Sequence, residues 1–113
     1  MVNELDATFA ALAEPTRRRV IELLRERPRP ATELAAQVGT SGPAMSRHLR
    51  VLRTSGLVAG ERVDHDARLH VYRLRPEPFD ALREWLDEVR AFWSDQLGAY
   101  QAHVERTRGG HST

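Results

Sequence analysis

Apolar residues recur every three or four positions along much of this chain, and that spacing is typical of amphipathic helices. The pattern predicts a first helix near residues 4–13. A second helix is predicted to start after Pro15 and to stop at the Arg-Pro repeat of residues 27–30. A short third helix follows at residues 33–38, with Thr32 as the residue that caps its first turn.

A fourth helix, predicted over residues 43–55, has two different faces. Ser41 can cap its start, and Gly56 can end it. One narrow face carries large apolar side chains: Met45, Leu49 and Leu52. The opposite face carries polar and basic side chains: Ser46, Arg47, Arg50, Arg53 and Thr54. We therefore expect one face to lie in a core and the other to meet a charged partner.

Residues 57–63 and 67–74 are rich in the residue types that favour strands, and the second stretch partly alternates between apolar and polar side chains. Between them, residues 64–67 are predicted to form a turn. Two short helices joined by a tight turn and followed directly by a hairpin form a winged helix-turn-helix. The expected fold class is therefore mainly α with a small β-hairpin, in the order of four helices, two strands and a last helix.

The last helix is predicted to begin after residues 76–79 and to run to about Arg106. Its main apolar stripe has residues spaced three or four apart, and a second stripe adds Trp85, Phe92 and Ala99 at a spacing of seven. A small winged domain can cover one such stripe, so the surplus apolar surface predicts pairing with another chain. Packing within a single chain is the alternative.

Charge is distributed unevenly along the chain, although the net charge of all 113 residues is only +1. Residues 15–75 hold 13 arginines against 6 acidic residues, a net charge of +7, whereas residues 1–14 and 76–113 each have a net charge of −3. A basic centre between acidic ends indicates a domain that binds a polyanion through its middle. We assign residues 1–106 to one DNA-binding and dimerisation domain and residues 107–113 to a flexible tail.

Several classes of protein are disfavoured by what the sequence lacks. It holds no cysteine, which excludes a disulfide framework and a thiolate metal site. No apolar run approaches the roughly 18 residues of a membrane span, and the acidic N-terminus does not resemble a signal peptide. We expect a cytoplasmic protein without membrane contact. No nucleophile–base pair, phosphate loop or carboxylate dyad is apparent, so we expect no enzyme activity.

The sequence resembles the ArsR family of bacterial winged-helix repressors in three stretches, ALAEPTRRRVIELL, ATELAAQVGTSGPAMSRHLRVLRTSGLV and RLHVYRL. The resemblance covers about residues 5–75, and its most specific part is the Ser-x-His-Leu-x-x-Leu pattern of residues 46–52. It implies a homodimer that binds a double-stranded DNA operator with the fourth helix in the major groove. It also implies that the first and last helices pair across the dimer.

The chain departs from the metal-sensing members of this family. Those members carry cysteines on the third helix or an Asp and His set on the last helix. Here the third helix reads Glu-Leu-Ala-Ala at residues 33–36, and the last helix has only His103, followed three residues later by Arg106. A single imidazole does not make a four-ligand site, so we expect no metal and no cofactor.

The resemblance and the basic outer face together predict two sets of site residues. Arg47 and Arg50 are expected to read guanine, and Ser46 a base or a phosphate, although a solvated face is the ordinary alternative. The full set of predicted DNA contacts is Arg17, Ser41, Ser46, Arg47, His48, Arg50, Arg53, Arg62 and Arg68. The predicted dimer interface comprises Leu5, Phe9, Leu12, Leu82, Leu86, Val89, Trp93, Leu97 and Tyr100. His48 can instead be a packed residue, and Arg53 can instead pair with an acidic group.

The function that these observations favour is a metal-independent transcriptional repressor. Its operator is expected to be an imperfect palindrome, because a two-fold dimer places its recognition helices about 34 Å apart, one turn of DNA. Two alternatives stay open. One is a related regulator with a small apolar ligand as effector at the helix seam, and the other is a winged-helix module that binds protein instead of DNA.

Overall fold

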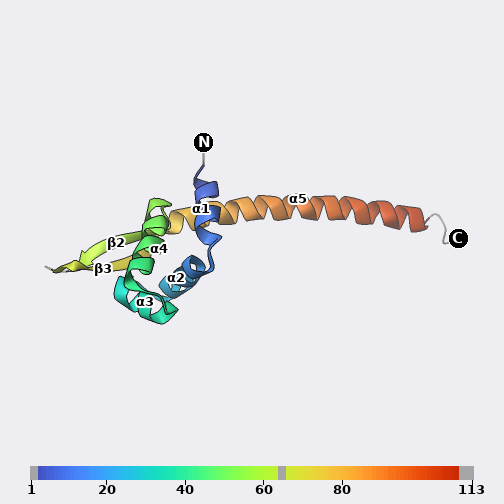
Figure 1. Ribbon diagram of the computed structural model, residues 1–113. Coiled ribbons are helices and arrows are strands. Elements are labelled where there is room, and N and C mark those ends of the chain that lie inside the picture. The colour runs from blue at the N-terminus through green and yellow to red at the C-terminus, as the bar shows by residue number, and fades with distance from the viewer. Residues whose placement is uncertain (1–2, 64–65, 110–113) are drawn as a thin grey trace. The chain divides into compact units, whose positions relative to one another are not determined.

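The computed structural model describes residues 3–63 and 66–109, without the side chains of residues 66–69 and 108–109. The elements follow in the order α1 Glu4–Leu12, α2 Pro15–Glu26, β1 Arg29–Pro30, α3 Ala31–Val38, α4 Gly42–Thr54, β2 Val58–Val63, β3 Asp66–Leu74 and α5 Pro76–Gly109 (Figure 1). They fall into two compact units, residues 1–81 and 82–113, and α5 spans the boundary. The predicted winged helix-turn-helix order is confirmed, with one additional strand, β1.

The core of the first unit lies among α2, α3, α4 and the start of β2. Its buried members are Ala11, Val20, Leu23, Leu24, Leu34, Ala35, Met45, Leu49, Leu52, Leu57 and Val58. The predicted inward face of α4 is confirmed, because Met45, Leu49 and Leu52 are 1%, 2% and 0% exposed. Full burial of an apolar side chain of this size contributes roughly 1.5–3 kcal/mol. The core therefore fixes α4 with its basic face outward.

The first helix, α1, packs on this core through small side chains. Thr8 and Ala11 are buried, and the Thr8 hydroxyl donates a hydrogen bond to the Glu4 carbonyl (3.0 Å), so its burial leaves no unsatisfied group. Leu5 and Phe9, which belong to the predicted dimer interface, are less covered, and Phe9 is 41% exposed. Thr8 and Ala11 are thus the buried residues of α1, and the partly buried Leu12 packs against the same core.

The helix-turn-helix is formed by α3 and α4. The prediction that Thr32 caps α3 is wrong, because the helix already begins at Ala31 and Thr32 lies in its first turn. Pro30 occupies the cap position without a side-chain hydrogen bond, and its ring leaves no amide to satisfy. Gly39 ends α3 with a φ of 77°, a left-handed conformation that favours glycine. Ser41 caps α4 as predicted.

The wing is a three-stranded antiparallel sheet with the strand order β1-β3-β2, not the two-stranded hairpin that the sequence pattern predicts. The short β1 pairs Arg29 with Tyr72 and Pro30 with Val71. The predicted turn at residues 64–67 is too long, because Asp66 and the residue after it already belong to β3 and only residues 64–65, which are not described, separate the strands. The local turn preference of Asp gives way there to strand pairing.

The last helix, α5, begins at Pro76, earlier than predicted. Both prolines of residues 76–79 lie in its first turn, where a missing amide costs no helical hydrogen bond. In the second unit α5 carries large apolar side chains with high exposure: Leu86, Phe92, Trp93, Leu97 and Tyr100. Among the described residues, no helix combines the length and the apolar character needed to cross a membrane.

Candidate nucleic-acid interface

The outward face of α4 presents three arginines. Arg47, Arg50 and Arg53 are all exposed, as is Ser46 beside them. Within the described residues, none of these three guanidinium groups takes part in an ion pair. Each guanidinium has five N–H donors in a fixed planar fork that matches phosphate and the guanine edge. The face can therefore bind an anionic partner without first breaking a described ion pair.

Two hydroxyl groups near α4 serve the helix itself. The Ser41 hydroxyl oxygen accepts a hydrogen bond from the Ala44 amide (3.2 Å), which caps the first turn. The Thr54 hydroxyl donates to the Arg50 carbonyl one turn earlier (2.7 Å). Ser41 thus has a structural role in the free protein, and a DNA contact by its hydroxyl stays a prediction.

The arginines at the start of α2 bind the end of α1. Arg17 donates from Nε to the Ala11 carbonyl (2.7 Å) and from Nη2 to the Ala10 carbonyl (3.3 Å). Arg18 donates to the Leu12 carbonyl (2.7 Å). These carbonyls lie in the last turn of α1, where cations are favourable. The placement gives Arg17 a structural role, which the sequence pattern does not reveal, and its predicted DNA contact stays a prediction.

His48 lies on the flank of α4 and faces the start of α2. Its Nδ1 is 3.7 Å from a carboxylate oxygen of Glu14, and its side chain is 22% exposed. Glu14 caps α2 by accepting the Arg17 amide (2.9 Å). Although desolvation raises the pKa of the Glu14 carboxyl, the amides of Arg17 and Thr16 and the nearby His48 hold that pKa below its ordinary value. This geometry favours the packed alternative for His48.

The wing carries the remaining predicted contacts. Arg62 is exposed on β2, opposite His70 of β3, at a register irregularity between Arg62 and Val63. Arg68 belongs to β3, but its side chain lies outside the described part of the chain. An ion pair that the sequence pattern does not reveal joins Arg73 Nε to Glu61 (3.2 Å). Arg73 therefore contributes less free positive charge to the wing than a count of arginines suggests.

A buried guanidinium joins α2, β1 and α3, and sequence reasoning missed it. Arg29 is 6% exposed and donates to the Leu23 carbonyl (3.0 Å), to Glu33 (2.7 Å) and to Glu26 (2.6 Å). Arg27 adds a second hydrogen-bonded contact to Glu33. The hydrogen bond from Arg27, and that from Arg29, hold the pKa of Glu33 below its ordinary value against partial desolvation. The cluster fixes α3, the first helix of the helix-turn-helix.

The predicted dimer residues lie on α1 and along α5. Leu5, Leu12, Leu82 and Val89 are partly covered within the chain, whereas the others are exposed: Phe9, Leu86, Trp93, Leu97 and Tyr100. In the second unit the spacing of these residues places them along one side of α5. Their assignment to a dimer interface stays a prediction.

The described residues hold no group of three or more His, Asp or Glu side chains arranged to bind a metal. His103, the predicted remnant of a family metal site, is exposed on α5. Its backbone carbonyl accepts the Thr107 hydroxyl (2.9 Å) in the ordinary helical manner. The part of the chain that the structure describes thus offers no site with three or more His and carboxylate ligands.

Comparison with known proteins gives consistent matches. A family model described as a helix-turn-helix domain matches residues 12–61. The chain is 40% identical over 104 residues to the HTH-type transcriptional regulator Rv2034 of Mycobacterium tuberculosis, with 88% of each chain covered. A crystal structure of an ArsR family transcriptional regulator, RHA00566, aligns with a TM-score of 0.74 and 32% identity, covering 81% of this chain and 98% of that one. An ArsR-like transcriptional regulator from Rhodococcus sp. RHA1 aligns with a TM-score of 0.77 and 28% identity, covering 91% and 92%.

These similarities extend well beyond the helix-turn-helix. The family model ends within β2, whereas the alignments to the regulators cover most of both chains. The relatives are regulators of transcription and not enzymes. The chain therefore belongs to the ArsR family of helix-turn-helix transcriptional regulators.

Proposed function

We propose that this regulator is a repressor that binds a palindromic DNA operator as a homodimer, with α4 in the major groove. The observation that carries the proposal is the outward face of α4, where Arg47, Arg50 and Arg53 are exposed and make no ion pair with a described residue. The core fixes the opposite face of the same helix. A helix held in this way can enter the major groove, which is wide enough to admit it.

The position of each arginine along α4 decides whether we assign it to a DNA base or to the DNA backbone. Arg47 and Arg50 lie near the middle of the helix, where side chains reach base edges, and arginine donates two hydrogen bonds to guanine. Arg53 lies in the last turn, and we assign it to a phosphate contact. Arg62 and Arg68 of the wing are assigned to phosphates, which position a protein without specifying sequence.

A homodimer is supported by the apolar surface of the second unit. Phe92, Trp93, Leu97 and Tyr100 are 54–67% exposed, an unusual surface for a chain that acts alone. A two-fold dimer places its two recognition helices about 34 Å apart and thereby demands a palindromic operator. Repression then follows if the operator overlaps a promoter.

Selection of bound fragments from a random DNA pool tests the proposal, because it reports binding, palindromy and half-site spacing together. On the selected operator, Arg47→Ala or Arg50→Ala should weaken binding by roughly 1–3 kcal/mol and relax the preference at one or two symmetric base pairs. Arg90→Ala, an exposed arginine of α5, is the matched control and should change neither quantity. Unchanged base preference in both α4 variants, together with an altered preference in Arg62→Ala, would assign reading to the wing and overturn the proposal.

A further inference from the structure

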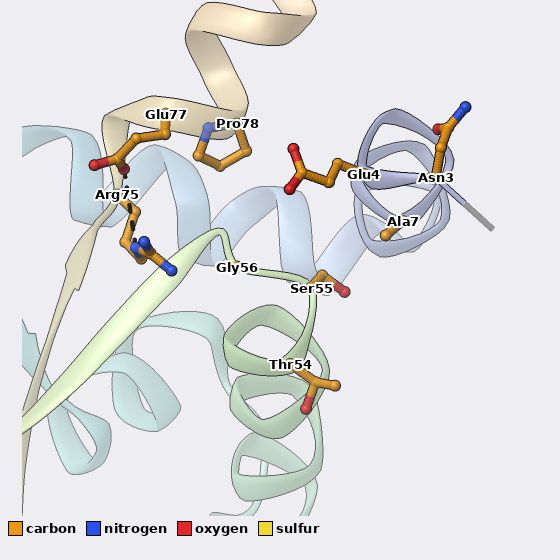
Figure 2. Close-up of a pocket in the computed structure, with 9 residues that line it drawn as sticks. All are labelled: Asn3, Glu4, Ala7, Thr54, Ser55, Gly56, Arg75, Glu77 and Pro78. Atoms are coloured by element: carbon orange, nitrogen blue, oxygen red, sulfur yellow. Dashed lines mark ion pairs between the residues drawn. The ribbon is translucent and has the colours of Figure 1, made fainter. Parts of the chain in front are cut away.

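A cavity with both polar and apolar lining lies where α1 begins, where α4 ends and where β3 passes into α5 (Figure 2). Its volume is about 360 Å³, within the range of pockets that hold small molecules. The lining residues are Asn3, Glu4, Ala7, Thr54, Ser55, Gly56, Arg75, Glu77 and Pro78, all in the first unit. None of them belongs to the predicted DNA contacts or to the predicted dimer interface.

Two opposite charges on different walls of this cavity have unused hydrogen-bonding capacity. Arg75 forms one ion pair, with Glu77, and at 3.9 Å this contact is longer than a hydrogen bond. Its guanidinium makes no hydrogen bond with a described residue and is 3.9 Å from the position that a Cβ at Gly56 would take. Figure 2 shows the Glu4 carboxylate on the α1 wall, directed toward Pro78. That carboxylate accepts no hydrogen bond from any described residue.

The chemistry of these walls matches a small zwitterion. A guanidinium binds a carboxylate through two parallel hydrogen bonds, and a carboxylate such as Glu4 accepts from an ammonium group. The end of α4 adds the negative pole of a helix dipole, which favours the ammonium end. An α-amino acid carries both charged groups on one carbon atom and is small enough for the cavity.

The walls of the cavity also belong to the elements that would contact DNA. The Arg75 amide donates to the Leu57 carbonyl (2.9 Å), and the Leu57 amide donates to the Leu52 carbonyl of α4 (2.9 Å). These two hydrogen bonds connect the last turn of α4, through Leu57, to the residue that follows β3. A ligand that bridges Glu4 and Arg75 would favour one position of α1 relative to α4 and the end of β3. A ligand shifts a conformational equilibrium only by binding one conformation more tightly than the other.

We propose that this cavity is an effector site for a free amino acid and that its occupancy changes the affinity for operator DNA. The binding half of the proposal stands on the cavity alone. The regulatory half rests on the proposed DNA-binding function.

The test begins with binding in the absence of DNA. The proteinogenic L-amino acids are titrated one by one into the full chain, and the amide NMR spectrum is followed. At least one should shift the amides of Glu4, Gly56 and Arg75. Its N-acetyl and carboxamide derivatives, which each lack one charge, should bind about tenfold more weakly or worse. Absence of any saturable shift at the lining residues overturns the proposal.

Two variants locate the site. Glu4→Gln and Arg75→Met should each weaken binding of that amino acid by about tenfold or more, while the spectrum away from the cavity shows an intact fold. Glu84→Gln and Arg90→Met on α5 are matched controls for the loss of one charge and should bind as the unmodified chain does. Equal binding by all four variants would place the ligand elsewhere and overturn the assignment.

Operator affinity is then measured with and without the amino acid. A change of about fivefold or more, absent from Glu4→Gln, is the expected result for allosteric coupling. Binding of the amino acid without any change in operator affinity overturns the regulatory half. Failure of the chain to bind any selected DNA, both with and without the amino acid, instead refutes the proposed function, and the titrations without DNA still decide whether the cavity binds an amino acid.

Discussion

Replacing Arg29 by Met is expected to destabilise the helix-turn-helix, although Arg29 is far from the basic face of α4 in sequence and is not a predicted DNA contact. Methionine keeps most of the apolar volume of the buried stem and removes only the guanidinium. That group is the common partner of the Leu23 carbonyl, of Glu26 and of Glu33. Its removal separates the end of α2 from the first turn of α3.

The expected loss of unfolding free energy depends on how well water can solvate each former partner of Arg29 after the substitution. The Leu23 carbonyl loses the Nε donor in a buried setting, at a cost of about 1 kcal/mol. The bond to Glu33, whose side chain is 27% exposed, contributes about 1.5 kcal/mol as a charge-assisted bond. The bond to Glu26, whose side chain is 65% exposed, contributes roughly 0.5 kcal/mol because water replaces it. The expected loss is about 3 kcal/mol out of a stability of roughly 5–15 kcal/mol.

Urea denaturation followed by circular dichroism checks this value. Arg29→Met should lower the unfolding midpoint by roughly 1–2 M. The control is Arg27→Met, which removes a second guanidinium from Glu33 but one whose side chain is 55% exposed, so its cost should stay below about 1 kcal/mol. If the two variants lose equal stability, burial of the Arg29 guanidinium contributes nothing beyond the surface pair, and the reasoning is refuted.

Three further predictions concern pH, assembly and metals. Because the pKa of Glu33 is lowered on folding, its ionised form contributes stability above the ordinary pKa of 4.5 that is lost as the pH falls through the lowered value. Glu33→Gln should therefore be less stable than the unmodified chain at neutral pH, and the difference in urea midpoint should shrink in acid. Leu86→Glu or Trp93→Glu should give monomers in sedimentation at a cost of several kcal/mol, and operator affinity should fall with them; a variant that stays dimeric contradicts the interface. Zinc, cadmium, nickel and arsenite should neither bind tightly in calorimetry nor release DNA, because cysteine is absent and His103 is the only histidine in the sequence of α5; tight binding of one ion per subunit contradicts this.

Most of the fold could be predicted from periodicity because the core of the first unit is built from amphipathic helices. The apolar stripe of α4 is the clearest case. Gly39 marks the turn before it through a left-handed backbone conformation, and Ser41 through the hydroxyl that caps the helix. The strand β1 could not be predicted, because two residues carry no periodicity and one of them is proline. It exists through pairing with β3, which is distant in sequence.

The sequence predicts which face of α4 forms the candidate site, but it does not predict which arginines are already bound by other groups of the protein. Periodicity identifies the outward residues of α4, and the structure confirms their exposure. It does not reveal that Arg17 and Arg18 bind the carbonyls that end α1, because these contacts depend on how two helices meet. The cavity beside Arg75 has no sequence signal either, since its walls come from three separate segments.

The same distinction sets the expected salt dependence of DNA binding. The 13 arginines of residues 15–75 overstate the charge available to DNA, because several are already held by carbonyls or carboxylates of the protein. The three arginines of the α4 face and the two of the wing at positions 62 and 68 are the ones assigned to DNA, so a dimer should neutralise roughly six to ten phosphates. The slope of log affinity against log salt should then be about −5 to −9, since each phosphate contributes about −0.9. Arg53→Ala should make the slope shallower by roughly one for each phosphate that is no longer neutralised, about two per dimer, whereas Arg90→Ala on α5 should leave it unchanged. A slope near zero from low to physiological salt would contradict the proposed DNA binding by the repressor. Guanidinium groups that bind phosphates must displace the counterions condensed on the DNA, and this release makes the affinity depend on salt.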